Sequence, residues 1–222
     1  MRSFYWVGIG AAPGAAMSIG LGKTTLASQL RLNLLAWGVP TVIIPFAKGL
    51  KYIALLERAP LRFARLVHLY MSWGHSFQRS REAAIATQLA FQKYPSQPGQ
   101  PKNRPLLQAL GTEVGRDIFG DGAWVDLVAR QGEQCGATVV ISDDVRFDNE
   151  ASAVDLFVAI DPQLGDPAAH QKNLGGLQAA GVAPSYFGTN GHRSENSLTV
   201  APDLRLAPRW DQDGLSMVLN VI

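Results

Sequence analysis

The sequence predicts an α/β fold of three layers, in which a mostly parallel central sheet is covered by helices on both faces. Three observations predict it. Short, uninterrupted apolar runs such as Thr138–Ser142 (TVVIS) are typical of strands that are buried on both faces. Helical patterns such as Lys23–Trp37 lie between these runs. The 222 residues, 47% hydrophobic and 17% charged, suit a single domain with insertions.

The N-terminal part predicts a strand, a loop, a helix and a second strand. Phe4–Ile9 is a short apolar run, and the Gly- and Ala-rich Ala11–Leu21 predicts a loop. The helix Lys23–Trp37 ends at Gly38, and Thr41–Pro45 (TVIIP) predicts the next strand.

The middle of the chain is mostly helical. The helical patterns cover Lys51–Ala59, Leu61–Trp73, Arg79–Tyr94, Leu106–Ile118 and Ala123–Gln131. Pro95–Pro105 is rich in Pro, Gln and Gly and predicts a loop between two of them.

The C-terminal part returns to short strands. Thr138–Ser142 and Leu156–Ile160 predict strands, and a short helix is expected to begin over Ala151–Asp155. Gly165–Gly191 is rich in Gly, Pro, Ala and Asn, which indicates a flap. The chain then closes with Leu198–Val200, Leu204–Leu206 and a final helix near Leu215–Leu219.

Composition restricts the partners. Twenty Lys and Arg against 18 Asp and Glu leave a net charge of +2, too small to imply a nucleic acid or an anionic membrane. Cys135 is the only cysteine, so an intrachain disulfide is impossible and a cytoplasmic location is expected. The uncharged stretch Ser3–Gly22 resembles a secretion signal, but five glycines and Pro13 favour a strand and loop instead.

A candidate phosphate-binding loop opens the first helix. Gly20-Leu-Gly-Lys-Thr-Thr25 lies between a predicted strand and a predicted helix, the context that a P-loop requires. Glycines at positions 20 and 22 let backbone N–H groups surround phosphate oxygens, and the helix N-terminus adds positive potential. Lys23 can reach the β- and γ-phosphates of ATP, and the Thr24 hydroxyl can bind Mg²⁺.

The spacing of this loop is unusual. The common pattern G-x-x-x-x-G-K-[ST] would place its first glycine at position 17, which is Met17. The loop is therefore longer than standard, and the alternative is a helix that begins with Gly-Lys-Thr by chance. Taken alone, the motif indicates nucleotide binding and no particular reaction.

Two further segments carry polar side chains suited to a phosphorylated substrate. On a helix that begins near Pro105, Gln108 lies one turn beyond Arg104, and Gly111 and Thr112 follow on the same face. This face offers a cation for a phosphate and an amide for a base edge. The alternative is an ordinary amphipathic helix with a solvated face.

The second segment, Asp144-Val-Arg-Phe-Asp-Asn-Glu150, comes directly after the predicted strand Thr138–Ser142. Asp144, Arg146 and Glu150 are therefore expected in the crevice outside the carboxyl ends of the strands. An arginine there can bridge two phosphates. The alternative is a capped turn with a surface ion pair.

These blocks together resemble the deoxynucleoside monophosphate kinases of tailed bacteriophages. The matching blocks are RPLLQALGTEVGRDIFGDGAW (Arg104–Trp124), ISDDVRFDNEA (Ile141–Ala151), HRSENSL (His192–Leu198) and, more weakly, PFAKGLK (Pro45–Lys51). The resemblance implies a single P-loop kinase domain over residues 1–222, with a helical acceptor-binding insert at residues 51–131 and a flap or lid at residues 162–191.

The resemblance also implies roles for individual residues. Lys23, Arg104 and Arg146 would be catalytic, and Gly20, Gly22, Lys23, Thr24 and Thr25 would bind ATP. The monophosphate would be bound by Lys51, Arg104, Gln108, Gly111, Thr112, Trp124, Asp144, Arg146 and Glu150.

Several of these roles have competing interpretations. Trp124 would stack on the base or else be a core residue. Lys48 competes with Lys51 for the acceptor phosphate. His192 and Glu195 form an H-x-x-E element that is interpreted as a structural ion pair or a hinge. Arg79 and Arg81 are lid candidates, although a solvated helix face is favoured for both.

The expected reaction transfers a phosphoryl group from ATP to a deoxynucleoside 5′-monophosphate, with Mg²⁺ as cofactor, and gives ADP and the diphosphate. The resemblance makes a homodimer and a location in the host cytoplasm plausible expectations. Related enzymes often carry an acidic residue where this chain has Thr24. The alternatives are another small-molecule P-loop kinase and a non-catalytic ATP-binding switch protein.

Overall fold

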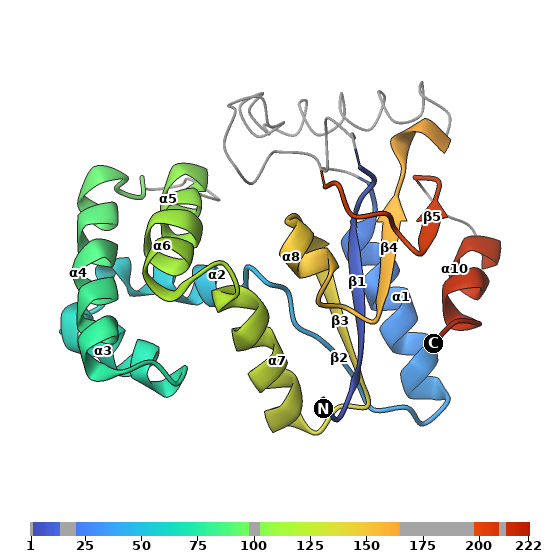
Figure 1. Ribbon diagram of the computed structural model, residues 1–222, viewed down its shortest axis with the longest axis horizontal. Helices are drawn as coiled ribbons and strands as arrows, with labels where there is room; N and C mark the ends of the chain where they lie inside the picture. Colours follow the sequence, from blue (N-terminus) through green and yellow to red (C-terminus); the bar gives the residue numbers. More distant parts are fainter. Residues whose placement is uncertain (1, 14–20, 98–102, 165–197, 209–211) are drawn as a thin grey trace. The chain divides into compact units, whose positions relative to one another are not determined.

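The chain divides into two compact units, each described here by itself. The computed structural model describes residues 2–13, 21–97, 103–164, 198–208 and 212–222 (Figure 1). The sheet unit comprises Met1–Pro45 and Val128–Ile222, and the helical unit is the continuous segment Phe46–Leu127. The helical unit is thus inserted into the sequence of the sheet unit, close to the expected bounds 51–131.

The sheet unit is built on five strands. They are β1 (Tyr5–Ala11), β2 (Thr41–Ile43), β3 (Val139–Val145), β4 (Leu156–Ile160) and β5 (Leu204–Leu206). Their order is β2-β3-β1-β4-β5, and all four pairings are parallel. The central strand β1 pairs Val7 with both Ile141 and Leu156. The α/β prediction is confirmed, and the sheet of the described residues is parallel throughout.

One face of the sheet is covered by α1 (Lys23–Ala36) and α10 (Gln212–Leu219), which contact each other (Figure 1). The helix α1 contributes Leu26, Leu30 and Leu34, which recur every four residues and therefore lie on one stripe. They pack against the alternate strand residues that point to this face, which include Val7, Ile9, Val139, Ile141, Leu156, Val158 and Ile160.

The remaining side chains of each strand point to the opposite face of the sheet. Trp6 is fully buried there, and its indole N–H donates to Ser142 Oγ at 3.0 Å, while the Ser142 hydroxyl donates to the Ile44 carbonyl at 2.7 Å. The helix α7 (Ala123–Cys135) approaches this face closely at Gly132, where an added Cβ would lie 2.6 Å from the Phe4 ring. Hence both faces of the sheet are buried, as the uninterrupted apolar strands predict.

The helical unit is built from short helices. They are α2 (Lys48–Leu55), the 3₁₀ turn η1 (Leu56–Arg58), α3 (Arg62–Ser72), α4 (Phe77–Lys93), α5 (Arg104–Ala109), the π-helix η2 (Leu110–Arg116), α6 (Asp117–Phe119) and the start of α7. Their core is centred on Tyr70, which is fully buried, hydrogen-bonds to Thr87 Oγ1 at 2.7 Å and meets Trp73 edge to face.

Some predicted boundaries were wrong. The strand predicted to end at Ser142 continues to Val145, so Asp144 lies in the strand and not after it. The short helix expected over Ala151–Asp155 is α8 (Asp148–Ala151), because Glu150 satisfies backbone donors at its first turn and so starts the helix earlier. Leu198–Val200 forms neither helix nor strand.

The predicted continuous helix Leu106–Ile118 is instead α5, η2 and α6 in succession, with a π-helical middle. The 3₁₀ turn η3 (Pro162–Leu164) leads into the flap expected at residues 162–191, and most of that flap lies outside the described residues. No helix in the described part of the chain is long and apolar enough to cross a membrane.

Candidate functional site

The strand order identifies β1 and β3 as the place where a ligand-binding crevice is expected. The chain leaves β1 through α1 toward β2 on one side, and leaves β3 through α8 toward β4 on the other side. Because β1 and β3 are hydrogen-bonded neighbours and their connections run toward opposite edges of the sheet, the carboxyl ends of these strands form a topological switch point. In open parallel sheets such a reversal of direction is where ligands bind.

The α1 side of this crevice carries the candidate phosphate loop. Gly22 precedes the first helical residue with φ 85°, a left-handed conformation that favours glycine, and its carbonyl accepts the N–H of Leu26 at 2.9 Å. No side chain caps the N-terminus of α1, and its first turn contains no acidic residue. Lys23, Thr24 and Thr25 form this first turn, and Gly20 lies outside the described residues.

A hydroxyl from α1 and a carboxylate from β3 meet in the crevice. Thr24 Oγ1 donates to Asp143 Oδ2 at 2.6 Å, although 119 residues separate them in the sequence. Asp143 is almost fully buried at 8% exposure, whereas Thr24 is exposed. This pair joins the first turn of α1 to β3 within the sheet unit.

Sequence reasoning assigned no role to Asp143. The available signal was its place in the Ser142-Asp-Asp144 run at the end of the predicted strand Thr138–Ser142. P-loop proteins hold Mg²⁺ between the Ser or Thr of the loop and an Asp of this kind. Adjacent residues of a strand point to opposite faces of the sheet, so only one of Asp143 and Asp144 can face Thr24. In this strand register it is Asp143.

Three charged groups, one cationic and two anionic, act on the amine of Lys23. Burial is the main cause that lowers its pKa from 10.5 to about 8, and the positive charge of Arg146 lowers it further. The carboxylates of Asp143 and Asp144 act in the opposite direction and partly stabilise the charged amine. Lys23, Asp144 and Arg146, all predicted site residues, are thus brought together in one unit, with Asp143 added.

Glu150 supports the turn that carries Arg146. Its carboxylate oxygen Oε2 accepts the backbone N–H groups of Arg146 at 2.9 Å and Phe147 at 3.3 Å, and the residue is only 3% exposed. A buried carboxylate at a helix start satisfies donors that have no partner within the helix. Glu150 was expected to line a substrate pocket, whereas the structure shows it buried beneath the turn that carries Arg146, where it acts as a positioning residue.

Asp148 fixes the other side of the same turn. Its carboxylate accepts the backbone N–H of Thr199 at 2.7 Å and that of Val200 at 3.2 Å, and also the Thr199 hydroxyl. These bonds lower the pKa of Asp148, with the hydroxyl bond as the largest cause. The turn between β3 and α8 is therefore held from two sides.

In the helical unit, Asn103 places Arg104 at the start of α5. The Asn103 carbonyl oxygen Oδ1 accepts the N–H of Leu106 at 3.1 Å, and its amide donates to the Tyr94 carbonyl at 2.8 Å and to Ser96 Oγ at 3.3 Å. Arg104 is the first residue of the helix and Gln108 lies one turn later, both half-buried. The structure confirms that these two residues share a helical face.

Gly111 and Thr112 lie in the π-helix η2, where the α-helical spacing that predicted a shared face with Gln108 does not apply, and both are half-buried. Single π-helical turns recur at functional sites because they widen the helix locally. Lys48 and Lys51 are both exposed on α2, in the same unit, so the structure does not choose between them.

Trp124 is a core residue of the helical unit. It is 4% exposed, its indole N–H donates to the Gly111 carbonyl at 3.0 Å, and its ring meets Trp73 edge to face. A Cβ added to Gly115 would lie 2.2 Å from this ring, so the ring fills the space that the glycine leaves. Stacking on a base requires an open ring face, and we therefore assign Trp124 a positioning role on Gly111 instead.

The two units differ strongly in net charge. The helical unit contains eleven Lys and Arg and six Asp and Glu, a net of +5, which leaves a net of −3 for the sheet unit. The small net charge of the whole chain conceals this difference. An excess of positive charge attracts anionic ligands to the helical unit.

Other predicted residues are placed as follows. Arg79 and Arg81 are exposed on the first turns of α4, as the solvated-face interpretation predicts. His192 and Glu195 lie outside the described residues. Cys135 is exposed and free. The described part of the chain contains no group of three or more His, Cys, Asp or Glu side chains suited to a metal ion.

Comparison with protein-family models finds no match to the chain, and comparison with curated proteins finds no significant match.

Proposed function

We propose that the protein transfers a phosphoryl group from ATP to a deoxynucleoside 5′-monophosphate. The observation that carries the proposal is the convergence of Lys23, Thr24, Asp143 and Arg146 at the carboxyl ends of β1 and β3. A lysine, a hydroxyl and a carboxylate beside the open N-terminus of a helix are the groups that a triphosphate with its Mg²⁺ requires.

The residues present fit Mg²⁺. The Thr24–Asp143 pair offers two oxygen ligands, and Mg²⁺ commonly takes one or two protein ligands and fills its other positions with water and phosphate oxygens. When bound, the ion supplies neutralisation of charge on the phosphates. Thr24 and Asp143 are the residues that would hold it.

The described residues then act by positioning and by charge. The backbone N–H groups at the start of α1 and the amine of Lys23 bind the phosphates of ATP, and Arg146 stabilises the charge that develops on the transferred group. Glu150 and Asp148 hold the Arg146 turn in place. No strong general base is needed, because the acceptor is a phosphate oxygen that is already ionised at neutral pH.

The helical unit supplies the acceptor side of the proposal. Arg104 binds the phosphate of the monophosphate, and Gln108 of α5 and Thr112 of η2 bind its nucleoside part. The net charge of +5 on this unit supports an anionic acceptor. A cleft that joins Arg104 to Lys23 is a requirement of the proposal.

A coupled assay of ADP release, run with each of the four common deoxynucleoside monophosphates, tests the proposal. We expect turnover with at least one of them. Lys23→Ala and Arg146→Ala should each lower kcat by about 10² or more, because each removes a cation from the transferring phosphate. Arg31→Ala is the matched control, since Arg31 is exposed on the same helix as Lys23.

The same assay separates the alternatives. Tight ATP binding without turnover on any monophosphate would overturn the kinase proposal in favour of a nucleotide switch. Turnover only with a sugar or a coenzyme precursor would support the proposed ATP site but would overturn the assignment of a deoxynucleoside monophosphate as the acceptor.

A further inference from the structure

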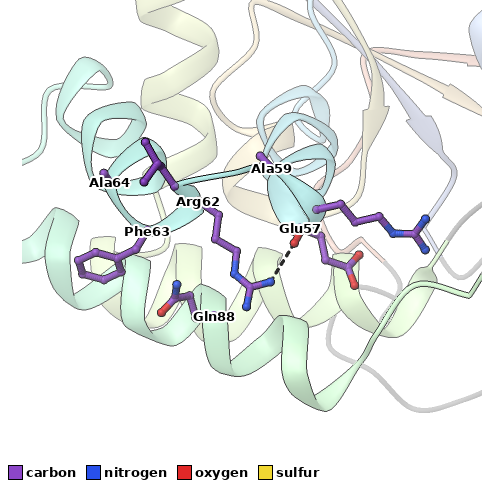
Figure 2. Close-up of a pocket in the computed structure, with 8 residues that line it drawn as sticks. Glu57, Ala59, Arg62, Phe63, Ala64 and Gln88 are labelled. Atoms are coloured by element: carbon purple, nitrogen blue, oxygen red, sulfur yellow. Dashed lines mark hydrogen bonds between the residues drawn. The ribbon is translucent and has the colours of Figure 1, made fainter.

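A groove in the helical unit is lined by two arginines, Arg58 and Arg62, that the proposed reaction does not use. It lies along η1, the start of α3 and one turn of α4, with a cavity volume of about 530 Å³ (Figure 2). This volume falls in the range of small-molecule sites, about 300–1,000 Å³. Its lining includes Arg58, Arg62, Phe63 and Gln88, and does not include Arg104.

The two arginines are held in place without being neutralised. Arg58 donates to the Ser96 carbonyl and Arg62 to the Glu57 carbonyl, each at 3.0 Å. Backbone carbonyls orient a guanidinium but leave its charge and most of its five donors available. Neither arginine forms an ion pair with a carboxylate of the described residues.

The one carboxylate of the groove is engaged elsewhere. Glu57 Oε1 accepts the backbone N–H of Ser96 at 2.9 Å, which fixes η1 to the chain that follows α4. Two guanidiniums beside a single engaged carboxylate leave an excess of positive charge in this open groove.

The groove also offers an aromatic ring and an amide. Figure 2 shows Phe63, Gln88 and Arg62 in sequence along the groove, with Glu57 beyond Arg62. Phe63 is 36% exposed, so part of its ring is open to a ligand. An exposed ring stacks on the face of any nucleobase, and an amide can donate to and accept from a base edge.

We propose that this groove binds a nucleoside diphosphate or triphosphate at a site separate from the Lys23 site. The two arginines bind the phosphates as planar, bidentate donors, and two of them match a ligand with at least two phosphates. Phe63 stacks on the base and Gln88 bonds to its edge. An uncharged ligand would leave both arginines unused, and an inorganic phosphate would leave the ring unused.

Calorimetric titration of deoxyadenosine diphosphate into the full-length chain tests this site. Every protein in the series carries Lys23→Ala, which weakens binding at the phosphate loop. Against that background, we expect Arg62→Gln and Phe63→Ala each to weaken binding about tenfold or more. Arg65→Gln is the matched control, because it removes the same charge from an exposed position of α3 outside the groove. We expect it to change Kd less than about twofold.

Two comparisons make the result decisive. Arg62→Lys keeps the positive charge but loses the planar guanidinium that donates two parallel hydrogen bonds. Its affinity for the nucleotide should therefore fall between those of the parent and Arg62→Gln. This intermediate affinity would also show that loss of folding does not explain the effect. Equal Kd values for the parent, Arg62→Gln and Arg65→Gln would overturn the site.

Pyrophosphate that binds as tightly as the nucleotide, with no effect of Phe63→Ala, would overturn the nucleotide assignment. This experiment measures binding and not turnover. If the protein is an active kinase but the groove substitutions do not change nucleotide binding, only this inference is overturned. An inactive chain that retains the groove effect would overturn only the proposed function.

Discussion

Replacing Lys23 by methionine should stabilise the nucleotide-free protein while it abolishes ATP binding. Burial, assisted by Arg146, lowers the pKa of Lys23 from 10.5 to about 8. Each pKa unit corresponds to about 1.4 kcal/mol, so the folded state disfavours the charged amine by roughly 3 kcal/mol at neutral pH. Methionine keeps the unbranched apolar stem and removes the charge. We therefore expect the free energy of unfolding to rise by up to roughly 3 kcal/mol near pH 7.

The gain should depend on pH in a definite direction. Below about pH 8 the amine is charged in both states, so the full penalty acts on the wild type. Between about 8 and 10.5 the unfolded chain keeps the proton and the folded chain releases it, so the wild type gains stability relative to the variant. The advantage of Lys23→Met should thus be largest near neutral pH and nearly vanish as the pH approaches 10.5.

Urea unfolding followed by circular dichroism, at several pH values from about 7 to about 10, measures this difference. The control is Arg31→Met on the same helix, where loss of the hydrogen bond to the Thr41 carbonyl should cost about 1 kcal/mol, and by the same amount at every pH. ATP binding is measured in parallel by calorimetry. A variant that is less stable than the wild type near pH 7, or a gain that stays constant with pH, would refute the account of Lys23 as a desolvated cation.

Three further outcomes follow from single contacts. Asp143→Asn should raise the Mg²⁺ concentration needed for half-maximal ADP release by about tenfold or more, because it weakens the carboxylate that is paired with the phosphate loop; an unchanged Mg²⁺ titration would contradict this role. Gly115→Ala should cost about 3 kcal/mol or more in urea unfolding, because its Cβ would lie 2.2 Å from the Trp124 ring. Gly111→Ala is the matched glycine with its nearest atom at 3.4 Å, and equal costs for the two would argue against overpacking. Asn103→Ala should cost about 1 kcal/mol of stability as a lost helix cap and raise KM for the monophosphate more than KM for ATP; a proportional change in both would show that it does not act on the acceptor side.

The sequence by itself was sufficient for the type and order of most elements. Uninterrupted apolar runs identified four of the five strands at nearly their observed positions, since a strand buried on both faces leaves this pattern. The helix α1 and its end at Gly38 followed from leucine periodicity and glycine, because both signals are local. The candidate phosphate loop could be recognised for the same reason.

Only the tertiary structure decided which residues of these elements meet. Asp143 rather than Asp144 bonds to Thr24, because strand register and the pairing of β1 with β3 set the direction of each side chain. Glu150 became a buried cap and Trp124 a core residue, although their motifs equally suited a pocket.

The separation of charge between the two units is likewise invisible in a net of +2, because it depends on which segments fold together. Local pattern determines an element, whereas contacts between residues more than a hundred positions apart depend on packing that no short segment encodes.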